Sequence, residues 1–225
     1  MNGAPAGAPW RCMLVTDRRR FTLSPSVLVE RARWAALAGV GVIQVRERDL
    51  PDRDLVELVR AIVEAAAAST CRVVVNDRAD IAIAAGASGV HLRADSMPAA
   101  RVRELLPGSM LLGRSIHSRE DAVIAAGDRA CDYLLFGTVF PSQGKPDGHA
   151  VAGLDELRAA CRAVATPVIA IGGIDAERAA AAAEAGAAGV AAIGTFMAVA
   201  DAASMRARVD DVRRAFDTRF PGCLQ

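Results

Sequence analysis

The sequence has no closely spaced pair of cysteines, few aromatic residues and no clear excess of either charge. Its five cysteines are odd in number and far apart, which argues against both a disulfide framework and a zinc site. Isolated cysteines of this kind are typical of small buried residues in a reducing compartment, so we expect a cytoplasmic protein. Lys and Arg total 27 against 26 for Asp and Glu, without a basic block, which disfavours nucleic acid or a membrane surface as the main partner.

Secretory and membrane-spanning segments are not expected either. The start, MNGAPAGAPWRC, lacks a cationic segment followed by an apolar core, so we predict no signal peptide. The segment 180–200 is long and nearly uncharged, but it contains Glu184 and is interrupted by Gly186, Gly189 and Gly194. It therefore predicts a helix, a turn, a strand and a loop rather than a membrane span. A small-molecule ligand is the expected partner.

One short pattern recurs along the chain. An Ala-rich helical segment meets a glycine, and an apolar strand follows within a few residues. Such a glycine suits the left-handed residue just past the end of a helix. The glycines concerned are Gly39, Gly86, Gly127 and Gly186. Each copy is therefore the second half of a strand–helix–strand unit.

The same pattern, extended over the whole chain, predicts strands that alternate with helices. The strands are expected near residues 12–17, 42–47, 72–77, 89–92, 110–116, 133–139, 167–172 and 189–194. This alternation implies a parallel sheet, and the number of units favours a single (β/α)8 TIM barrel over a doubly wound sheet. We expect residues 1–225 to form one domain, with 1–11 and 218–225 as peripheral tails.

In such barrels the active site lies where the strands end and the following loops begin. Gln44, Arg46 and Arg48 alternate along the second expected strand, so a period of two places them on one face. A buried arginine without a partner is costly, and phosphate is the anion that its planar fork fits best. The alternative is a salt bridge at the rim with Glu47 or Asp49.

The next three strand ends carry further candidates. Asn76 and Asp77 follow the third strand, where only one of them could cap the next helix, which leaves the other for a ligand or a metal. His91, on the fourth strand, would more often be a structural histidine than a ligand. Ser115 and His117 end the fifth strand, and a histidine at a strand end suits an acid or a base.

Glycines end the last two strands. Gly172 and Gly173 expose backbone N–H groups, Asp175 can cap the following helix, and Gly194 repeats the arrangement one strand later. Paired glycine ends at this place in a barrel hold phosphate, because N–H groups and a helix N-terminus point to one spot. Lys145 lies in the long loop after the sixth strand and could close over an anion, although an ordinary surface loop is the alternative.

Six segments resemble, in the same order, the successive signatures of the thiamine phosphate synthase and TenI family. They are QVRERDL, VVVNDRADIAIAAGASGVHL, LLGRSIHS, DYLLFGTVFPSQGK, PVIAIGGI and GVAAIG, and the match covers about residues 12–200. For a synthase, the resemblance implies that Mg²⁺ helps pyrophosphate leave a pyrimidine diphosphate, and that the nitrogen of a thiazole phosphate captures the resulting cation. For a TenI protein, it implies aromatisation of a carboxylated thiazole phosphate tautomer without a metal.

The resemblance also implies site residues. The residues expected to be catalytic are His117, Arg46 and Lys145. The residues expected to bind the substrate are Gln44, Arg48, Asn76, His91, Ser115, Gly172, Gly173, Ile193 and Gly194. Asp77 and Asp95 are expected to hold Mg²⁺ only if the protein is a synthase.

Two departures from the synthase pattern favour the TenI reaction. Synthases usually read HLGQEDLP where this chain reads HLRADSMP, so the metal-binding aspartate falls on Ser96, and Asp95 comes one residue early. A typical PTxTK becomes PSQGK, which removes a threonine hydroxyl at Gly144. Loss of a metal carboxylate should impair metal-assisted departure of pyrophosphate, so we expect a thiazole tautomerase that needs no cofactor.

Other functions are kept as alternatives. The first is a thiamine phosphate synthase that uses Mg²⁺ and takes a pyrimidine diphosphate as well as a thiazole phosphate. A non-catalytic binder of such phosphorylated compounds, or a regulator, is another, because a fold does not fix a function. A phosphate-binding barrel of tryptophan or histidine biosynthesis fits the ordered segments less well. The Ala-rich helix faces would allow a homo-oligomer without specifying one.

Overall fold

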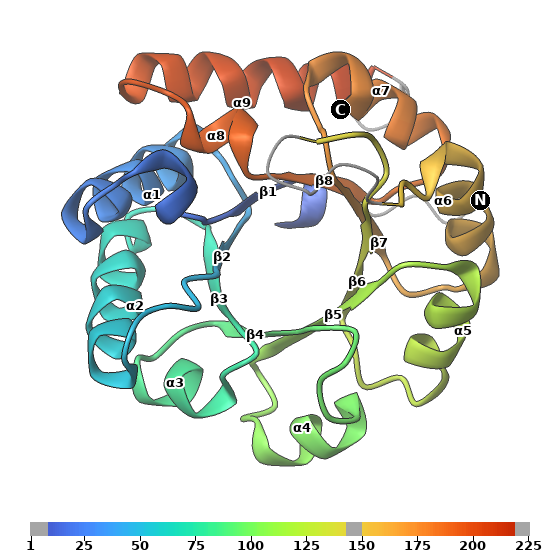
Figure 1. Cartoon of the computed structure of the whole chain (residues 1–225), viewed down its shortest axis with the longest axis horizontal. Helices are drawn as coiled ribbons and strands as arrows, with labels where there is room; N and C mark the ends of the chain where they lie inside the picture. Colours follow the sequence, from blue (N-terminus) through green and yellow to red (C-terminus); the bar gives the residue numbers. More distant parts are fainter. Residues whose placement is uncertain (1–8, 143–149, 219–225) are drawn as a thin grey trace.

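The computed structural model describes residues 9–142 and 150–218 of the chain. Its strands close into a barrel in chain order, each parallel to the next, and β8 pairs with β1 (Figure 1). The strands are β1 (Cys12–Val15), β2 (Val42–Val45), β3 (Arg72–Asn76), β4 (Gly89–Leu92), β5 (Leu111–Ile116), β6 (Tyr133–Gly137), β7 (Val168–Ile171) and β8 (Gly189–Ala192). Each lies within its predicted range, so the predicted (β/α)8 TIM barrel is confirmed.

Helices surround the barrel (Figure 1). They are α1 (Pro25–Ala38), α2 (Asp52–Ala66), α3 (Ala79–Ala84), α4 (Ala99–Leu105), α5 (Arg119–Gly127), α6 (Gly153–Ala163), α7 (Ala176–Glu184), α8 (Gly194–Met197) and α9 (Ala202–Asp217), with short 3-10 turns η1 (Pro9–Arg11) and η2 (Arg19–Phe21). Four helices, α1, α5, α7 and α9, begin with a side chain that accepts a backbone N–H of the first turn; the accepting residues are Ser24, Ser118, Asp175 and Asp201. None of the helices in the described ranges is long and apolar enough to cross a membrane.

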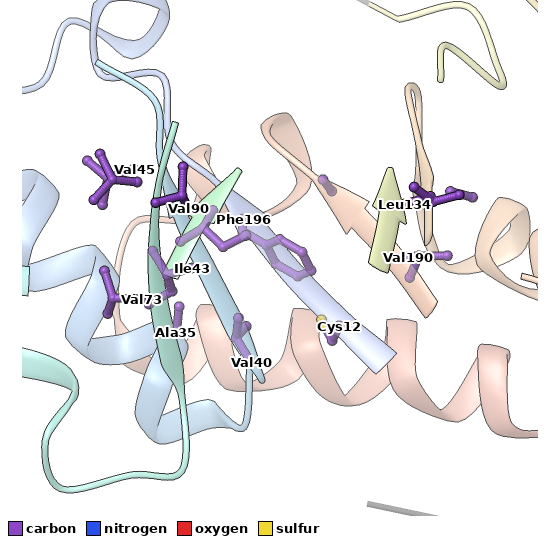
Figure 2. Packing of buried hydrophobic residues seen from close by; sticks show 14 of the residues in the cluster. Cys12, Ala35, Val40, Ile43, Val45, Val73, Val90, Leu134, Val190 and Phe196 are labelled. Carbon is purple, nitrogen blue, oxygen red and sulfur yellow. The ribbon is translucent and has the colours of Figure 1, made fainter. Parts of the chain in front are cut away.

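The strand residues alternate between two hydrophobic clusters, as the period of two requires. The cluster inside the barrel contains Met13, Val15, Val42, Val74, Tyr133, Leu135, Ile169 and Ala191. The larger cluster fills the space between the barrel and the helices, where Ile43 and Val73 lie near Ala35 of α1 (Figure 2). Because Val42 points inward, the next inward-facing residue of β2 is Gln44, at the end of the strand.

Trp10 closes the N-terminal end of the barrel. Its ring centroid lies 5.2 Å from that of Tyr133, and its side chain packs on the inner cluster. Its carbonyl oxygen approaches Gly189 so closely that a Cβ there would lie only 1.8 Å away. Residues 9–11 thus pack on the end of the barrel, within the stretch 1–11 that we expected to be peripheral.

The glycine pattern is confirmed at three positions and wrong at one. Positive φ angles of 100°, 68° and 99° are found at Gly39, Gly86 and Gly186. Gly127 instead forms the last residue of α5, and Arg129 takes the left-handed conformation with a φ of 55°. The segment 180–200 contains the second half of α7, then β8, which confirms the predicted helix, turn and strand, but the short helix α8 follows where a loop was predicted.

Candidate active site

A cavity of about 830 Å³ opens at the carboxyl ends of the strands. The charged residues in its described lining, besides His117, are Arg20, Arg46, Arg48, Arg93, Arg178, Asp95 and Asp175. Five arginines against two aspartates make the cavity suited to an anionic ligand. The strands β2 and β3 lie across the ring from β6 and β7 (Figure 1).

Gln44 and Asn76 form a polar pair on one side of the cavity. Gln44 is only 2% exposed, and its Nε2 donates to Asn76 Oδ1 over 3.0 Å. Gln44 Oε1 is buried and has no hydrogen-bond partner in the part of the chain that the structure describes. An unpaired buried acceptor is costly, so this oxygen is suited to receive a donor from a ligand.

Arg46 and Arg48 continue the inward-facing row from Gln44, as the sequence predicted, and both line the cavity. Arg46 Nη1 lies 3.5 Å from Asp17 Oδ2, which is a loose ion pair. No ion pair of Arg48 is found with any described residue. Burial lowers the pKa of Arg48, and the positive charges of Arg46 and Arg93 lower it further. An anion would relieve this repulsion.

The alternative of a rim salt bridge with Glu47 or Asp49 is wrong. Arg18 forms ion pairs with both carboxylates. Its Nη2 atom lies 2.5 Å from Asp49 Oδ2, and its Nε atom lies 3.7 Å from Glu47 Oε2. Glu47 also accepts the backbone N–H of Arg18, at 3.1 Å. The cavity arginines of the second strand therefore remain available for a ligand.

Asp77 caps no helix. The residue before α3 is Arg78, which makes no capping hydrogen bond, and Asp77 has a φ of 61°, a conformation that aspartate tolerates. Its carboxylate lies 3.6 Å from Arg93 Nη1 and accepts a hydrogen bond from Ser96 Oγ. Arg93 also contacts Asp95, so a single guanidinium lies between two carboxylates.

Asp77, Asp95 and Ser96 are not arranged to bind a divalent cation at the place that the sequence resemblance implies. Arg93 already pairs with the carboxylates of both Asp77 and Asp95, and Ser96 stands at the third position. Within residues 9–142 and 150–218, no group of three or more His, Cys, Asp or Glu side chains could hold a metal ion. Mg²⁺ is usually held by one or two carboxylates together with water and substrate phosphates, but here the Arg93 guanidinium occupies the place between the two carboxylates.

His91 is buried behind the cavity wall instead of lining it. It is 1% exposed, with Nδ1 3.0 Å from the Tyr133 hydroxyl and Nε2 2.9 Å from Ser115 Oγ. Burial lowers the pKa of His91 to about 3, so the ring is neutral at physiological pH. Direct contact with substrate, which we expected, is therefore not available to His91. It orients Ser115, which does line the cavity.

His117 lies at the end of β5 and lines the cavity. Its Nδ1 atom contacts the carbonyl oxygen of Gly137, and a carbonyl can only accept, so Nδ1 carries the proton. In the neutral form of the ring, the lone pair is therefore on Nε2. The backbone N–H of His117 donates to Asp121 Oδ2 over 2.9 Å, which holds the strand end against α5. This geometry suits a base or a hydrogen-bond acceptor.

The ends of β7 and β8 form the expected glycine-rich seat, and Gly172, Gly173, Ile193 and Gly194 all line the cavity. Gly173 has a φ of 64°, and a Cβ there would lie 2.5 Å from the carbonyl oxygen of Pro141. Only glycine fits this bend. No acceptor for the backbone N–H of Gly173 or Gly194 is found among the described residues, so both are available to an anion.

Arg20 and Arg178 border this seat and were not predicted from the sequence. Arg20 Nη2 lies 3.6 Å from the place that a Cβ of Gly194 would take. Arg178 Nη1 donates to the carbonyl of Gly173 over 2.8 Å, while its guanidinium lies over the Phe140 ring. Arg20 belongs to a run of three arginines without periodicity, so the sequence carried no signal for it.

Lys145, the expected catalytic lysine, and Gly144 lie outside the described residues. The described residues on the N-terminal side of that loop, Thr138, Pro141 and Ser142, line the cavity. The loop therefore leaves the barrel beside the glycine-rich seat.

Comparison with known proteins identifies the family of the chain. The family described as thiamine monophosphate synthase (TMP-TENI) matches residues 12–196. A putative thiamine-phosphate synthase from Geobacter sulfurreducens is 42% identical over 188 residues, which cover 84% of this chain and 87% of that protein. A thiamine-phosphate synthase from Moorella thermoacetica is 40% identical over 184 residues, covering 82% and 87%.

A solved structure is similar over nearly the full length of both chains. The thiamine phosphate pyrophosphorylase from Pyrococcus furiosus has a TM-score of 0.80 and 30% sequence identity, covering 94% of this chain and 97% of that one. The matched region contains all eight strands and the residues that line the cavity. The chain therefore belongs to the thiamine monophosphate synthase family, whose members are enzymes of thiamine biosynthesis.

Proposed function

We propose that the protein is a thiamine phosphate synthase, which joins a pyrimidine diphosphate to a thiazole phosphate and releases pyrophosphate. The sequence alone favoured the TenI tautomerase, but relatives at about 40% identity are named thiamine-phosphate synthase, which favours the alternative. The single observation that carries the proposal is the presence of cationic groups on both sides of the cavity.

The two sides of the cavity suit two anions of different size, a diphosphate and a single phosphate. Arg46, Arg48 and Arg93 gather at the ends of β2 and β4, while Gly173 and Gly194 expose N–H groups at the ends of β7 and β8. Planar guanidinium groups suit a diphosphate, and paired N–H groups suit a single phosphate. A tautomerase with one phosphorylated substrate needs only the second seat and a contact for a carboxylate.

The pair of Gln44 and Asn76 lies on β2 and β3, on the same side of the cavity as the three arginines, and suits the pyrimidine. Gln44 Oε1 has no partner among the described residues, and an aminopyrimidine would supply an N–H donor to it. The Gln44–Asn76 hydrogen bond fixes both amide groups before the ligand arrives. A fixed polar pair orients the ring at lower entropic cost than a mobile one.

The synthase reaction depends on separation of charge rather than on transfer of a proton. The bond between the pyrimidine methylene carbon and the diphosphate oxygen breaks, and its electron pair leaves with pyrophosphate. Arg46, Arg48 and Arg93 stabilise the developing negative charge in a partly enclosed site. The thiazole nitrogen then uses its lone pair to form the new C–N bond with the methylene cation.

This chemistry assigns supporting roles to the remaining polar residues. The thiazole nitrogen has no proton to lose, so His117 is not needed as a base in the synthase reaction. Ser115, which His91 orients, and His117 Nε2 can hold the substrates in line. Mg²⁺, when bound in a synthase, supplies further charge neutralisation, but Arg93 lies between the carboxylates that would hold it.

The tautomerase is kept as a second candidate because of one observation. His117 lines the cavity, and its Nδ1 contact with the Gly137 carbonyl leaves Nε2 as the nitrogen that could act as a base for a proton shift on the thiazole. In that reaction, the arginines of β2 would hold the substrate carboxylate rather than a diphosphate.

Two variants distinguish these functions. Pyrophosphate release and aromatisation of the carboxythiazole phosphate should be measured for wild type, Arg48→Gln and His117→Asn. The synthase predicts that Arg48→Gln lowers kcat/KM for pyrophosphate release by about 100-fold, and that His117→Asn lowers it by less than about tenfold. Aromatisation that His117→Asn abolishes, without pyrophosphate release from wild type, would overturn the synthase in favour of the tautomerase.

A further inference from the structure

We propose that the Arg93 guanidinium serves as a built-in cation between Asp77 and Asp95, so that the cavity binds a diphosphate group without a divalent metal ion. One Arg93 nitrogen, Nη1, lies 3.6 Å from Asp77 Oδ2, and Nη2 contacts Asp95 Oδ2. A metal ion could bind both carboxylates only by displacing this side chain. The nature of the ligand rests on the proposed function, whereas the position of Arg93 does not.

The backbone places Arg93 at this position independently of its ion pairs. The Arg93 N–H donates to Ser96 Oγ over 2.9 Å, and Ser96 Oγ donates to Asp77. An exposed ion pair alone would contribute little to holding the side chain. Here the serine that replaces the expected metal ligand closes the turn and links it to Asp77.

A second arginine holds the same turn from the neighbouring strand. The Arg114 guanidinium donates to the carbonyl oxygens of Ala94, Ser96 and Met97 over 2.8, 3.1 and 3.0 Å. Three charge-assisted hydrogen bonds to backbone carbonyls fix the loop between β4 and α4. The Arg93 side chain therefore starts from a fixed backbone beside the cavity.

The neighbouring charges give Arg93 a role toward an anion. Arg46 and Arg48 line the same cavity, and the pKa of Arg48 is lowered in part by the charges of Arg46 and Arg93. Asp77 and Asp95 offset part of the repulsion among the three guanidinium groups, and a bound anion would reduce it further. Arg93 has five N–H donors, so two carboxylate contacts leave others for diphosphate oxygens.

Calorimetry with inorganic pyrophosphate tests this directly. Wild type, Arg93→Gln and Arg101→Gln should be titrated in EDTA and again with Mg²⁺. Arg101 is a matched control, because it is exposed on α4 and pairs only with Glu104 among the described residues. We expect wild type and Arg101→Gln to bind in EDTA, and Arg93→Gln to bind at least about tenfold more weakly there.

Electron paramagnetic resonance of Mn²⁺ gives a readout that needs no substrate. Wild type should bind Mn²⁺ weakly, and Arg93→Gln should bind it at least about tenfold more tightly, because two carboxylates are then freed. Thermal melting confirms that each variant is folded. Tight Mn²⁺ binding by wild type, or pyrophosphate binding by wild type only with a metal, would overturn the inference.

The outcomes separate this inference from the proposed function. Robust synthesis of thiamine phosphate that strictly needs Mg²⁺, with Mn²⁺ bound tightly by wild type, would overturn the built-in cation and leave the synthase standing. Metal-free pyrophosphate binding that depends on Arg93, in a protein that makes no thiamine phosphate, would support the built-in cation and overturn the synthase.

Discussion

The Nε2 atom of His91 lies 2.9 Å from the Oγ atom of Ser115. His91 is on β4 and Ser115 on β5, so the contact joins neighbouring strands beneath the cavity. The other ring nitrogen lies 3.0 Å from the Tyr133 hydroxyl, and the three side chains form a line from the barrel interior to the cavity wall. A neutral buried histidine thereby fixes the direction of a hydroxyl group that faces the ligand.

The buried position of His91 predicts a dependence of stability on pH. The pKa of His91 falls to about 3 in the folded state through burial, while an unfolded histidine titrates near 6.5. The unfolded state therefore binds the proton first, so stability is complete above about 6.5 and is lost as pH falls toward 3.

Urea unfolding of wild type and His91→Asn at pH 7 and pH 5 measures this effect. The free energy of unfolding of wild type should fall by about 2 kcal/mol more than that of the variant from pH 7 to pH 5. An equal loss in the two proteins would contradict a neutral buried His91.

Gln44→Leu should selectively weaken binding of the pyrimidine substrate. The substitution removes the buried Oε1 acceptor and the hydrogen bond to Asn76, and a lost polar partner in a buried site costs about 1–3 kcal/mol. We expect KM for the pyrimidine diphosphate to rise at least about tenfold, with KM for the thiazole phosphate changed by less than about threefold. Steady-state kinetics with each substrate varied would show this, and equal rises in both constants would contradict it.

The prediction of the fold succeeded because it depends on local patterns. Alternation along 42–48 correctly placed Gln44, Arg46 and Arg48 on the inner face, since a strand has a period of two. The left-handed conformation of Gly86 was correctly predicted because glycine is favoured just past the end of a helix. The prediction for Gly127 was wrong because the residue in the left-handed conformation lies two positions later.

Parts of the site could not be predicted because they depend on contacts between distant segments. Arg93 was seen only as a departure from a pattern, and its contact with Asp77 requires β3 and β4 to lie side by side. Arg20 reaches the seat at β7 and β8 from a segment far away in the chain, whereas Arg178 lies on α7, directly after that seat. His91 was expected to touch substrate, and only its hydrogen bonds to Tyr133 and Ser115 reveal a supporting position.

Gly173→Ala should weaken binding of the thiazole phosphate. A Cβ at Gly173 would lie 2.5 Å from the Pro141 carbonyl oxygen, and its φ of 64° disfavours alanine. We expect KM for the thiazole phosphate to rise at least about tenfold through displacement of the seat.

Gly86→Ala is a matched control for this substitution. Gly86 has a φ of 68°, but a Cβ added there would meet no described atom within 4 Å, and Gly86 does not line the cavity. The variant should lose about 1 kcal/mol of stability through backbone strain and keep its kinetics. Equal kinetic losses in the two variants would show that backbone strain, rather than the seat, is responsible.

The cysteines should react slowly in the folded protein. Burial raises the pKa of Cys12, Cys71 and Cys161 to about 12 and that of Cys131 to about 11. Because the thiolate is the reactive form, labelling with a disulfide reagent at pH 8 should be at least about 100-fold slower than in urea. The measurement uses Cys223→Ser, since Cys223 lies outside the described residues, and one rapidly labelled native thiol would contradict it.

The most direct test of the central claim is the identity of the products formed from both substrates together. Purified protein should be incubated with the pyrimidine diphosphate and the thiazole phosphate, and thiamine phosphate and pyrophosphate should be quantified by mass spectrometry and a coupled assay. We expect thiamine phosphate and pyrophosphate to form in equal amounts. Aromatisation of a carboxythiazole phosphate by a protein that forms neither product would contradict it.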